Sequence, residues 1–180
     1  MKITTRGKKA YIQTPYHSTF VARIKQISGA RWNPKKRAWV VDVEFLPLVR
    51  QIMDEIFGES DVPAEGERYN IKLTFHTDIS SRPLDGVYFF AKCLAFAYNY
   101  GNGARFGDGV NYLSGGCTLR GTIQNWVSVV QAGSVIMVYD VPETLVKNAL
   151  PTAGVNYEFI VCQPDAEINQ QASPQPQLGT

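Results

Sequence analysis

Ten lysine and arginine residues lie within the first 41 positions of this chain, and no aspartate or glutamate accompanies them. Positive charge without nearby negative charge attracts polyanions, of which nucleic acid is the commonest. The densest part is the turn at positions 34–37, which two tryptophans bracket. We therefore expect phosphate contacts from eight residues of this basic head: Lys8, Lys9, Arg23, Lys25, Arg31, Lys35, Lys36 and Arg37.

The two tryptophans that bracket this turn have a spacing typical of a β-hairpin. A turn centred on Lys35 and Lys36 makes Trp32 and Trp39 direct cross-strand partners on one face. Such a pair needs burial to hold together, so we interpret both tryptophans as mainly structural. The charges at the tip would project into solvent, where they can meet phosphates.

A second candidate site is the glycine-dense stretch 99–121, which holds seven of the chain's 15 glycines. Arg105 and Asp108 lie among these glycines, and we expect both to be exposed and to bind a partner. Two alternatives remain open for the stretch. Freed backbone amides could form an anion-binding nest, or the glycines could simply serve turns and bulges.

An alternative interpretation is that the chain is an enzyme, with His76, Tyr88 and Glu158 as its candidate site residues. This set resembles that of ADP-ribosyltransferases of the His-Tyr-Glu kind. The resemblance implies that the histidine and the tyrosine hold the nicotinamide nucleotide of NAD and that the glutamate polarises its ribose. We predict instead a non-catalytic protein without a cofactor.

The remaining composition narrows the class of protein. The acidic residues, 16 in all, share positions 42–180 with only eight basic ones, so a basic head precedes an acidic body. No apolar stretch reaches the roughly 20 residues of a membrane span, and the first residues do not open a signal peptide. Three scattered cysteines and two histidines favour a reducing compartment and no metal site. We expect a cytoplasmic protein.

The basic head should fold as a small β-α-β-β-α module over residues 1–58. A strand is expected at 10–13, and Ser18 or Thr19 can begin a helix with Gly29 near its end. Strands at 31–33 and 37–43 form the tryptophan hairpin. A second helix then begins at Asp42 or Glu44 and ends at Gly58.

The rest of the chain predicts a linker, a second α+β domain and a tail. Residues 59–67 are acidic, contain Pro and Gly and lack periodicity, so they read as the linker. The second domain covers 68–162, and residues 163–180 are rich in Gln and Pro and predict a disordered tail. Its expected elements are a strand at 69–76, a helix or buried strand pair at 84–98, a glycine-dense loop at 99–121, a short helix at 123–130, a strand at 135–139, a short helix at 143–150 and a strand at 155–162.

Residues 24–41, which read IKQISGARWNPKKRAWVV and precede a leucine-containing helix, resemble the HARP-type module found beside annealing helicases and some phage integrases. The likeness covers about residues 10–57. It implies DNA binding, with a preference for branched DNA or for junctions between single and double strands. The chain contains no Gly-x-x-x-x-Gly-Lys-Ser/Thr motif, so helicase action does not carry over.

These observations together predict a non-catalytic DNA-binding accessory protein of α+β fold. A HARP-like module without a motor suits a phage or mobile element, and one job would be interference with a host DNA-targeting complex, as an anti-CRISPR-type inhibitor of an effector nuclease. The expected partners are double-stranded or junction DNA and a host nuclease. The alternative is an ADP-ribosyltransferase-like enzyme that uses NAD.

Overall fold

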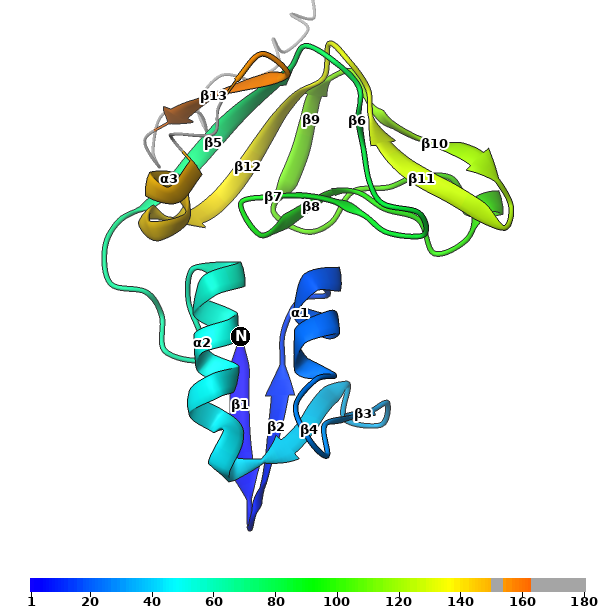
Figure 1. Cartoon of the computed structure of the whole chain (residues 1–180). Coiled ribbons are helices and arrows are strands. Elements are labelled where there is room, and N and C mark those ends of the chain that lie inside the picture. Colours follow the sequence, from blue (N-terminus) through cyan, green and yellow to red (C-terminus); the bar gives the residue numbers. More distant parts are fainter. Residues whose placement is uncertain (150–153, 163–180) are drawn as a thin grey trace, which may run out of the picture.

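The computed structural model describes residues 1–149 and 154–162, and these form an α+β protein as the sequence predicts. Two hydrophobic clusters divide them, one in an N-terminal unit of residues 1–58 and one in a β-rich unit of residues 68–162. Figure 1 shows the β-rich unit stacked on the helix ends of the N-terminal unit. The predicted tail at 163–180 and the last residue of the predicted helix 143–150 lie outside the described residues.

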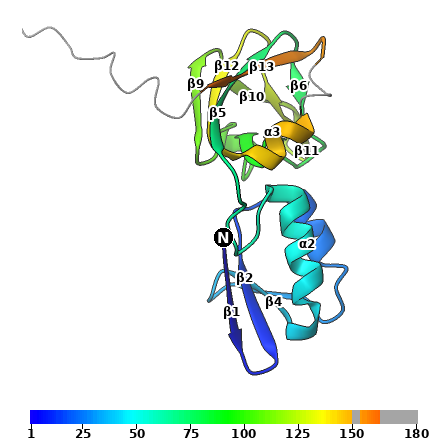
Figure 2. The same cartoon turned by 90° about the vertical axis from the view of Figure 1, so that its left-hand side faces the viewer.

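The N-terminal unit is a four-stranded antiparallel sheet with two helices on one face (Figure 2). The strands follow the order β1-β2-β4-β3. Phe20 and Ile24 from one helix and Val49, Ile52 and Met53 from the other pack against the sheet, all at most 3% exposed. The elements are β1 (Lys2–Arg6), β2 (Lys9–Gln13), α1 (Ser18–Ile24), β3 (Arg31–Asn33), β4 (Ala38–Asp42), the 3-10 turn η1 (Val43–Phe45) and α2 (Leu46–Phe57).

One strand of this unit was not expected from the sequence. Residues 2–6 form β1, which pairs with β2 through a tight turn at Gly7 and Lys8, so the unit is β-β-α-β-β-α. Gly7 has a φ of +58°, a conformation that glycine adopts without steric cost. The strand buries little of its side-chain surface, which is why no hydrophobic alternation marked it.

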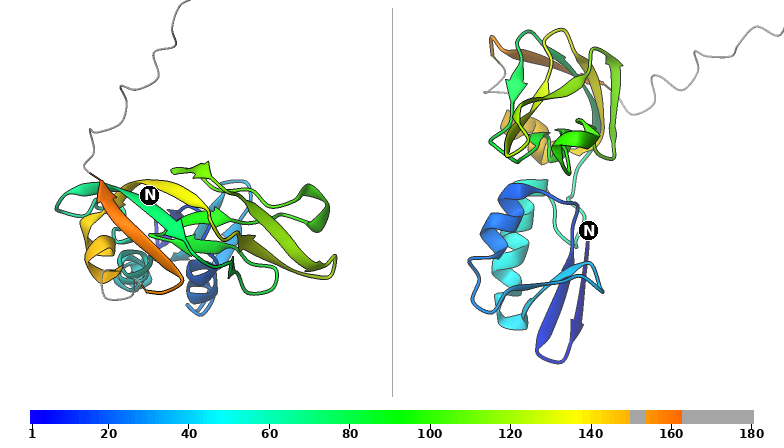
Figure 3. Two further views of the ribbon diagram at one scale, coloured as in Figure 1. Left: turned by 90° about the horizontal axis from the view of Figure 1, so that it is seen from above. Right: turned by 90° about the vertical axis from the view of Figure 1, so that its right-hand side faces the viewer.

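The β-rich unit wraps three sheets around one core (Figure 3). Its strand orders are β13-β5-β12-β9, β10-β11-β6 and β7-β8. Phe75, Leu94 and Ile136, from three different strands, are fully buried at its centre. The elements are β5 (Arg68–Phe75), β6 (Ile79–Ser80), β7 (Val87–Phe89), β8 (Lys92–Ala95), the 3-10 turn η2 (Tyr100–Asn102), β9 (Val110–Ser114), β10 (Cys117–Thr122), β11 (Asn125–Val130), β12 (Val135–Pro142), α3 (Glu143–Ala149) and β13 (Tyr157–Cys162).

Two sequence predictions for this unit were wrong. The segment 123–130 is not a helix, because residues 125–130 form β11 and pair along their whole length with β10. The region 99–121 is not one loop, since β9 and most of β10 lie within it. Short apolar runs do not distinguish strand from helix by periodicity, and here the cross-strand pairing decides. The segment 84–98 is a strand pair, one of the two predicted alternatives.

Side chains from several elements join the two units. The ring of His17 packs on Tyr88 with 4.3 Å between ring centroids. Ala91, in the β7–β8 turn, packs against the N-terminal cluster. The Thr144 hydroxyl donates a hydrogen bond to the Gly58 carbonyl at 3.1 Å. No helix within the described ranges is long and apolar enough to cross a membrane.

Candidate nucleic-acid interface

The strand register of the N-terminal unit gathers basic side chains on the sheet face away from the helices. Successive side chains of a strand point to opposite faces, and Ala10, Ile12 and Val41 point to the helices. The pairs Arg6–Lys9 and Arg31–Val40 must then lie on the open face. We call this surface the basic sheet face, and it carries Lys2, Arg6, Lys9 and Arg31, together with Lys36 from the adjoining turn.

The turn 34–37 extends the basic sheet face at one end. The Lys36 ammonium lies 3.8 Å from the centre of the Tyr11 ring, and the Gln13 side-chain amide donates to the Lys36 carbonyl at 2.9 Å. The Lys36 amide donates to Asn33 Oδ1 at 3.1 Å, which closes the turn. Arg37 has a φ of +46°, an uncommon conformation for a residue other than glycine. These contacts fix the tip, which exposes Lys35, Lys36 and Arg37.

The dimensions of this face suit a nucleic-acid backbone. Lys8 lies in the β1–β2 turn, at the end where Lys9 pairs with Asp42, and the turn 34–37 lies at the opposite end beside Gln13. Five-residue strands rise by about 17 Å, the length of about five base pairs of B-DNA. The only acidic residue on this face of the four strands is Asp42.

The structure separates the eight predicted phosphate contacts into groups. Three of them belong to the basic sheet face: Lys9, Arg31 and Lys36. Three more lie in the turns at its two ends: Lys8 in the β1–β2 turn, and Lys35 and Arg37 in the turn 34–37. Arg23 and Lys25 do not join them, because they lie on α1 and just after it, in the helix layer on the other side of the sheet. Arg23 and Lys25 therefore lie on a different surface from the other six predicted contacts.

Two of the eight residues have acidic partners in the fold, although no acidic residue occurs within the first 41 positions of the chain. Lys9 pairs with Asp42 at 2.8 Å, and Arg23 pairs with Glu55 of α2 at 2.5 Å. The hydrogen bond from Arg23 lowers the pKa of Glu55. Sequence composition could not show these ion pairs, because both acidic residues come after position 41 and lie near Lys9 and Arg23 only in the folded chain. Within the described ranges, Arg6, Arg31 and Arg37 have no carboxylate within 4.0 Å.

Sequence reasoning missed three residues of this face. Lys2 and Arg6 were counted among the basic residues but not assigned to the site, and Tyr11 was read only as part of a strand. The period of two in Lys2, Thr4 and Arg6 was the available signal for the first two. Tyr11 adds an aromatic ring beside Lys36 at the centre of the face.

The tryptophans form the predicted cross-strand pair, but their burial differs. Trp32 and Trp39 are direct partners, and their ring centroids are 5.6 Å apart in an edge-to-face arrangement. Trp39 is 8% exposed and belongs to the core, whereas Trp32 is 49% exposed at the edge strand. The structural interpretation therefore holds for Trp39, and Trp32 retains a large free surface.

The two residues of the second predicted site, Arg105 and Asp108, differ in how firmly the structure holds them. Both Arg105 and Asp108 are exposed, as expected. Arg105 exchanges two backbone hydrogen bonds of 2.8 Å with Phe96, and its guanidinium lies 5.4 Å from the centre of the Tyr98 ring. Asp108 lies in the turn before β9. Within residues 1–149 and 154–162, the side chains of Arg105 and Asp108 share no common contact.

The three residues of the alternative enzyme reading lie at two places. His76 Nε2 is 3.8 Å from Glu158 Oε2, and both side chains are about half exposed at the end of β5 and on β13. Tyr88 instead lines a pocket between the two units, and neither His76 nor Glu158 lines that pocket. The structure therefore brings His76 and Glu158 together but not Tyr88.

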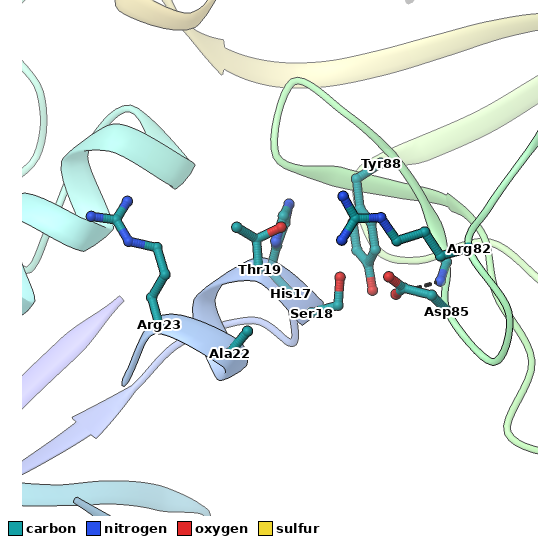
Figure 4. Close-up of a pocket in the computed structure, with 9 residues that line it drawn as sticks. His17, Ser18, Thr19, Ala22, Arg23, Arg82, Asp85 and Tyr88 are labelled. Atoms are coloured by element: carbon teal, nitrogen blue, oxygen red, sulfur yellow. Dashed lines mark hydrogen bonds between the residues drawn. The ribbon is translucent and has the colours of Figure 1, made fainter. Parts of the chain in front are cut away.

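That pocket has a volume of about 560 Å³ and lies between the first turn of α1 and the loop 81–86 (Figure 4). His17, Ser18 and Thr19 line it from the N-terminal unit, and Arg82, Asp85 and Tyr88 line it from the β-rich unit. Burial lowers the pKa of His17, although Asp85 opposes that effect. Burial likewise raises the pKa of Tyr88.

The part of the chain that the structure describes contains no cluster of three His, Cys, Asp or Glu side chains able to hold a metal ion. Cys93, Cys117 and Cys162 are free thiols, and burial raises the pKa of Cys93 to about 12. A thiol with so high a pKa is a poor nucleophile at neutral pH.

Comparison of the chain with protein-family models, curated proteins and solved structures finds no match. The resemblance of residues 10–57 to HARP-type modules therefore stays a prediction from sequence.

Proposed function

We propose that this chain is a non-catalytic nucleic-acid-binding protein whose N-terminal unit contacts phosphates through the basic sheet face. The observation that carries the proposal is the strand register, which places Lys2, Arg6, Lys9 and Arg31 on one face with a single acidic residue. Lys36 and the other cations of its turn extend the same surface. The HARP-like sequence pattern points to DNA as the nucleic acid.

The physical basis is the release of counterions. Each phosphate that a lysine or arginine neutralises releases condensed cations, so the logarithm of the affinity falls linearly with the logarithm of the salt concentration. The slope is about −0.9 per phosphate contact on B-DNA. Arg6 and Arg31 are the most informative residues, because neither has a described carboxylate partner that would compete with phosphate.

A matched pair of double variants tests the proposal. Arg6→Gln/Arg31→Gln and Arg23→Gln/Lys25→Gln remove the same charge from the same unit, but on opposite faces. Fluorescence anisotropy with a labelled duplex over a range of salt concentrations should show the slope reduced by about 2 units in the first variant. The second variant should keep a slope close to that of the wild type. Equal effects of the two variants would contradict the proposed face.

The turn provides a second measurement on the same surface. Neutralising Lys35, Lys36 and Arg37 together should reduce the slope by about 2–3 units, because all three are exposed at one end of the face. An unchanged slope would remove the turn from the interface.

We further propose that the protein acts as a phage-encoded accessory that interferes with a host DNA-targeting complex of the CRISPR effector type. The division into a basic unit and a second unit with an exposed Arg105 and Asp108 supports separate contacts to DNA and to a protein. Affinity capture from host lysate, with and without nuclease treatment, tests this. A protein partner that survives nuclease treatment and is lost in Arg105→Ala/Asp108→Ala supports it, and capture that depends entirely on nucleic acid contradicts it.

A further inference from the structure

The β3–β4 hairpin gives the sheet of the N-terminal unit an open edge. β3 pairs with β4 over Arg31, Trp32 and Asn33, and no other described strand covers its outer side. Figure 1 shows β3 and the turn that follows it projecting past α1. A ligand at this edge can therefore reach both faces of β3 at once, which no position at the centre of the sheet allows.

Two successive residues of β3 present a cation and an aromatic ring to opposite faces of the sheet. Arg31 lies on the basic sheet face beside Val40, and no carboxylate in the described ranges lies within 4.0 Å of its guanidinium. Side chains alternate along a strand, so Trp32 lies on the other face, with its partner Trp39 and the helices. A charge for phosphate and a ring for a base thus lie one residue apart around a single edge.

The Trp32 ring is held in place but not covered. It meets the Trp39 ring edge-to-face, with 5.6 Å between the centroids, and Trp39 itself is fixed in the core at 8% exposure. Trp32 is 49% exposed. A planar ring has two faces, so a ring with half of its surface free leaves the area of about one face for a ligand. Because Trp39 already orders the ring, stacking a ligand on it costs little conformational entropy.

The charges around Trp32 distinguish it from an ordinary exposed apolar residue. Single apolar residues on a surface are common and need no function. Trp32, however, follows Arg31 and precedes the exposed cations of the turn 34–37, in a segment of 41 residues without an acidic side chain. The hydrogen bond from the Lys36 amide to Asn33 Oδ1 fixes that turn next to β3. Cations that can hold a phosphate backbone therefore accompany the ring.

We propose that Trp32 stacks on one unpaired base of the bound nucleic acid, a proposal that rests on the nucleic-acid-binding function of the chain. Aromatic side chains bind unpaired bases by stacking, and the contact tolerates any base because every base has a π-face. The phosphates next to that base lie toward Arg31 and the turn 34–37, around the edge of β3. One nucleotide thereby contacts both faces of the edge strand.

Paired bases cannot make this contact from within a duplex. Neighbouring base pairs cover both faces of each base there, and only the base edges are open in the grooves. A duplex therefore contacts the basic sheet face through its phosphates, whereas an unpaired nucleotide can turn around β3 and place its base on Trp32. The ring adds affinity for unpaired nucleotides without selecting a sequence.

The experiment separates the contribution of the base from that of the phosphates beside it. Fluorescence anisotropy compares a blunt duplex, the same duplex with a short thymine tail, and the same duplex with an abasic tail of equal length. The abasic tail keeps every phosphate and lacks only the bases. With a tail of one polarity or the other, the wild type should bind the thymine-tailed duplex about tenfold more tightly than the abasic-tailed duplex, the order expected for one base stacked on an aromatic ring.

Three variants assign this preference to the ring. Trp32→Ala should abolish the preference for the thymine tail and leave the affinity for the blunt duplex unchanged. Trp32→Phe should keep most of the preference, because its ring can still stack on a base and still pack on Trp39. Leu48→Ala, the matched control, removes an apolar side chain that is 43% exposed on α2 of the same unit, and it should keep the full preference.

Intrinsic tryptophan fluorescence provides a readout that a merely structural role would not change. Stacking on a base quenches the emission of an indole. Saturation with the thymine-tailed duplex should therefore lower the emission of the wild type more than saturation with the abasic-tailed duplex. Trp32→Phe should still bind the thymine tail but lose this extra quenching, because the two remaining tryptophans do not contact it.

Each result decides for or against base stacking by Trp32. Equal affinity of the wild type for thymine and abasic tails, or a preference that survives Trp32→Ala, would overturn the proposal. An equal loss of affinity for all three ligands in Trp32→Ala would also overturn it. The salt slope on the blunt duplex reports the basic sheet face alone, so failure of the proposed function is recognised separately. A Trp32-dependent preference for the thymine tail without binding of the blunt duplex would support stacking and contradict the duplex contact.

Discussion

At the scale of single residues, burial separates side chains that the sequence presents as equivalent. Trp32 and Trp39 flank the same turn and pair directly, yet Trp39 is 8% exposed and Trp32 is 49% exposed. The helices cover the centre of the sheet and leave the edge strand β3 free. Trp39 therefore contributes to the core, whereas Trp32 leaves half of its surface free on the same side of the sheet as the helices.

Alanine substitutions of the two tryptophans should have unequal effects on stability. Trp39→Ala should cost about 3–5 kcal/mol, because it removes a large side chain from the core. Trp32→Ala should cost about 1 kcal/mol, the order of an aromatic pair contact at a half-exposed site. Urea unfolding followed by circular dichroism gives the two values, and hydrogen exchange of peptides from residues 1–58 locates the loss. A Trp39→Ala protein that stays folded but loses only DNA affinity would show that this ring contacts bases.

At the scale of elements, ion pairs tie the predicted linker to structured segments. Arg68, the first residue of β5, pairs with Glu59 at 2.7 Å and also with Asp140. Asp140 has a φ of +57° and lies at the bulge of β12, which turns its carboxylate toward Arg68. Arg50 of α2 holds Asp61 through two hydrogen bonds of 2.8 and 2.9 Å. The acidic stretch 59–67 therefore has fixed contacts at its start.

These pairs should make stability depend on pH in the acid range. The hydrogen bond from Arg68 lowers the pKa of Glu59 below its ordinary value of 4.5. Because the unfolded chain then binds more protons than the folded one, the stabilisation is present above about pH 4.5 and disappears as pH falls through the folded pKa. The melting temperature is measured from pH 6 to pH 3, and each protein's values are expressed relative to its own value at pH 7. The melting temperature of Arg68→Met should fall less over this range than that of the wild type.

The exposed Lys72, also on β5, provides the control for this measurement. Lys72→Met changes the net charge by the same amount without touching Glu59 or Asp140. It should retain the wild-type acid dependence. An Arg68→Met protein with an acid dependence identical to that of Lys72→Met would show that the Arg68 pairs do not contribute.

At the scale of the whole molecule, the contact between the two units depends on how α2 ends. Gly58 follows α2 with a φ of +76°, and a Cβ there would lie 2.7 Å from Leu145 Cγ and 2.9 Å from Thr144 Oγ1. Gly58 thus both ends the helix and lets α3 approach it. Phe57, the residue before Gly58, packs edge-to-face on His17, which lines the pocket.

Two glycine substitutions separate backbone conformation from contact between the units. Gly7→Ala and Gly58→Ala both place a side chain at positive φ, which costs about 1–2 kcal/mol. Only Gly58→Ala also forces a methyl group into α3, because nothing lies within 4 Å of a Cβ at Gly7. Thermal unfolding should show a loss larger by about 1–3 kcal/mol for Gly58→Ala, with faster hydrogen exchange in α3. Equal losses would mean that the units do not pack as described.

Much of the N-terminal unit follows from local sequence rules. Helical spacing of Phe20 and Ile24, a glycine at the end of α2 and the symmetric spacing of Trp32 and Trp39 predicted both helices and the hairpin with its register. These features depend on neighbours in the chain, so the sequence contains the whole signal. Charge counting likewise identified the basic head before any fold was known.

Tertiary structure alone decided which charges share a face and which are already paired. Lys2 and Arg6 lie on the basic sheet face because β1 pairs with β2. Only this pairing shows which side of β1 faces away from the helices. Lys9 and Arg23 form ion pairs with Asp42 and Glu55, which come later in the chain. The pocket joins residues from position 17 to position 88, and β11 is a strand because β10 pairs with it. Pairing between strands that are distant in the chain, burial and charge balance depend on neighbours in space, which local patterns do not specify.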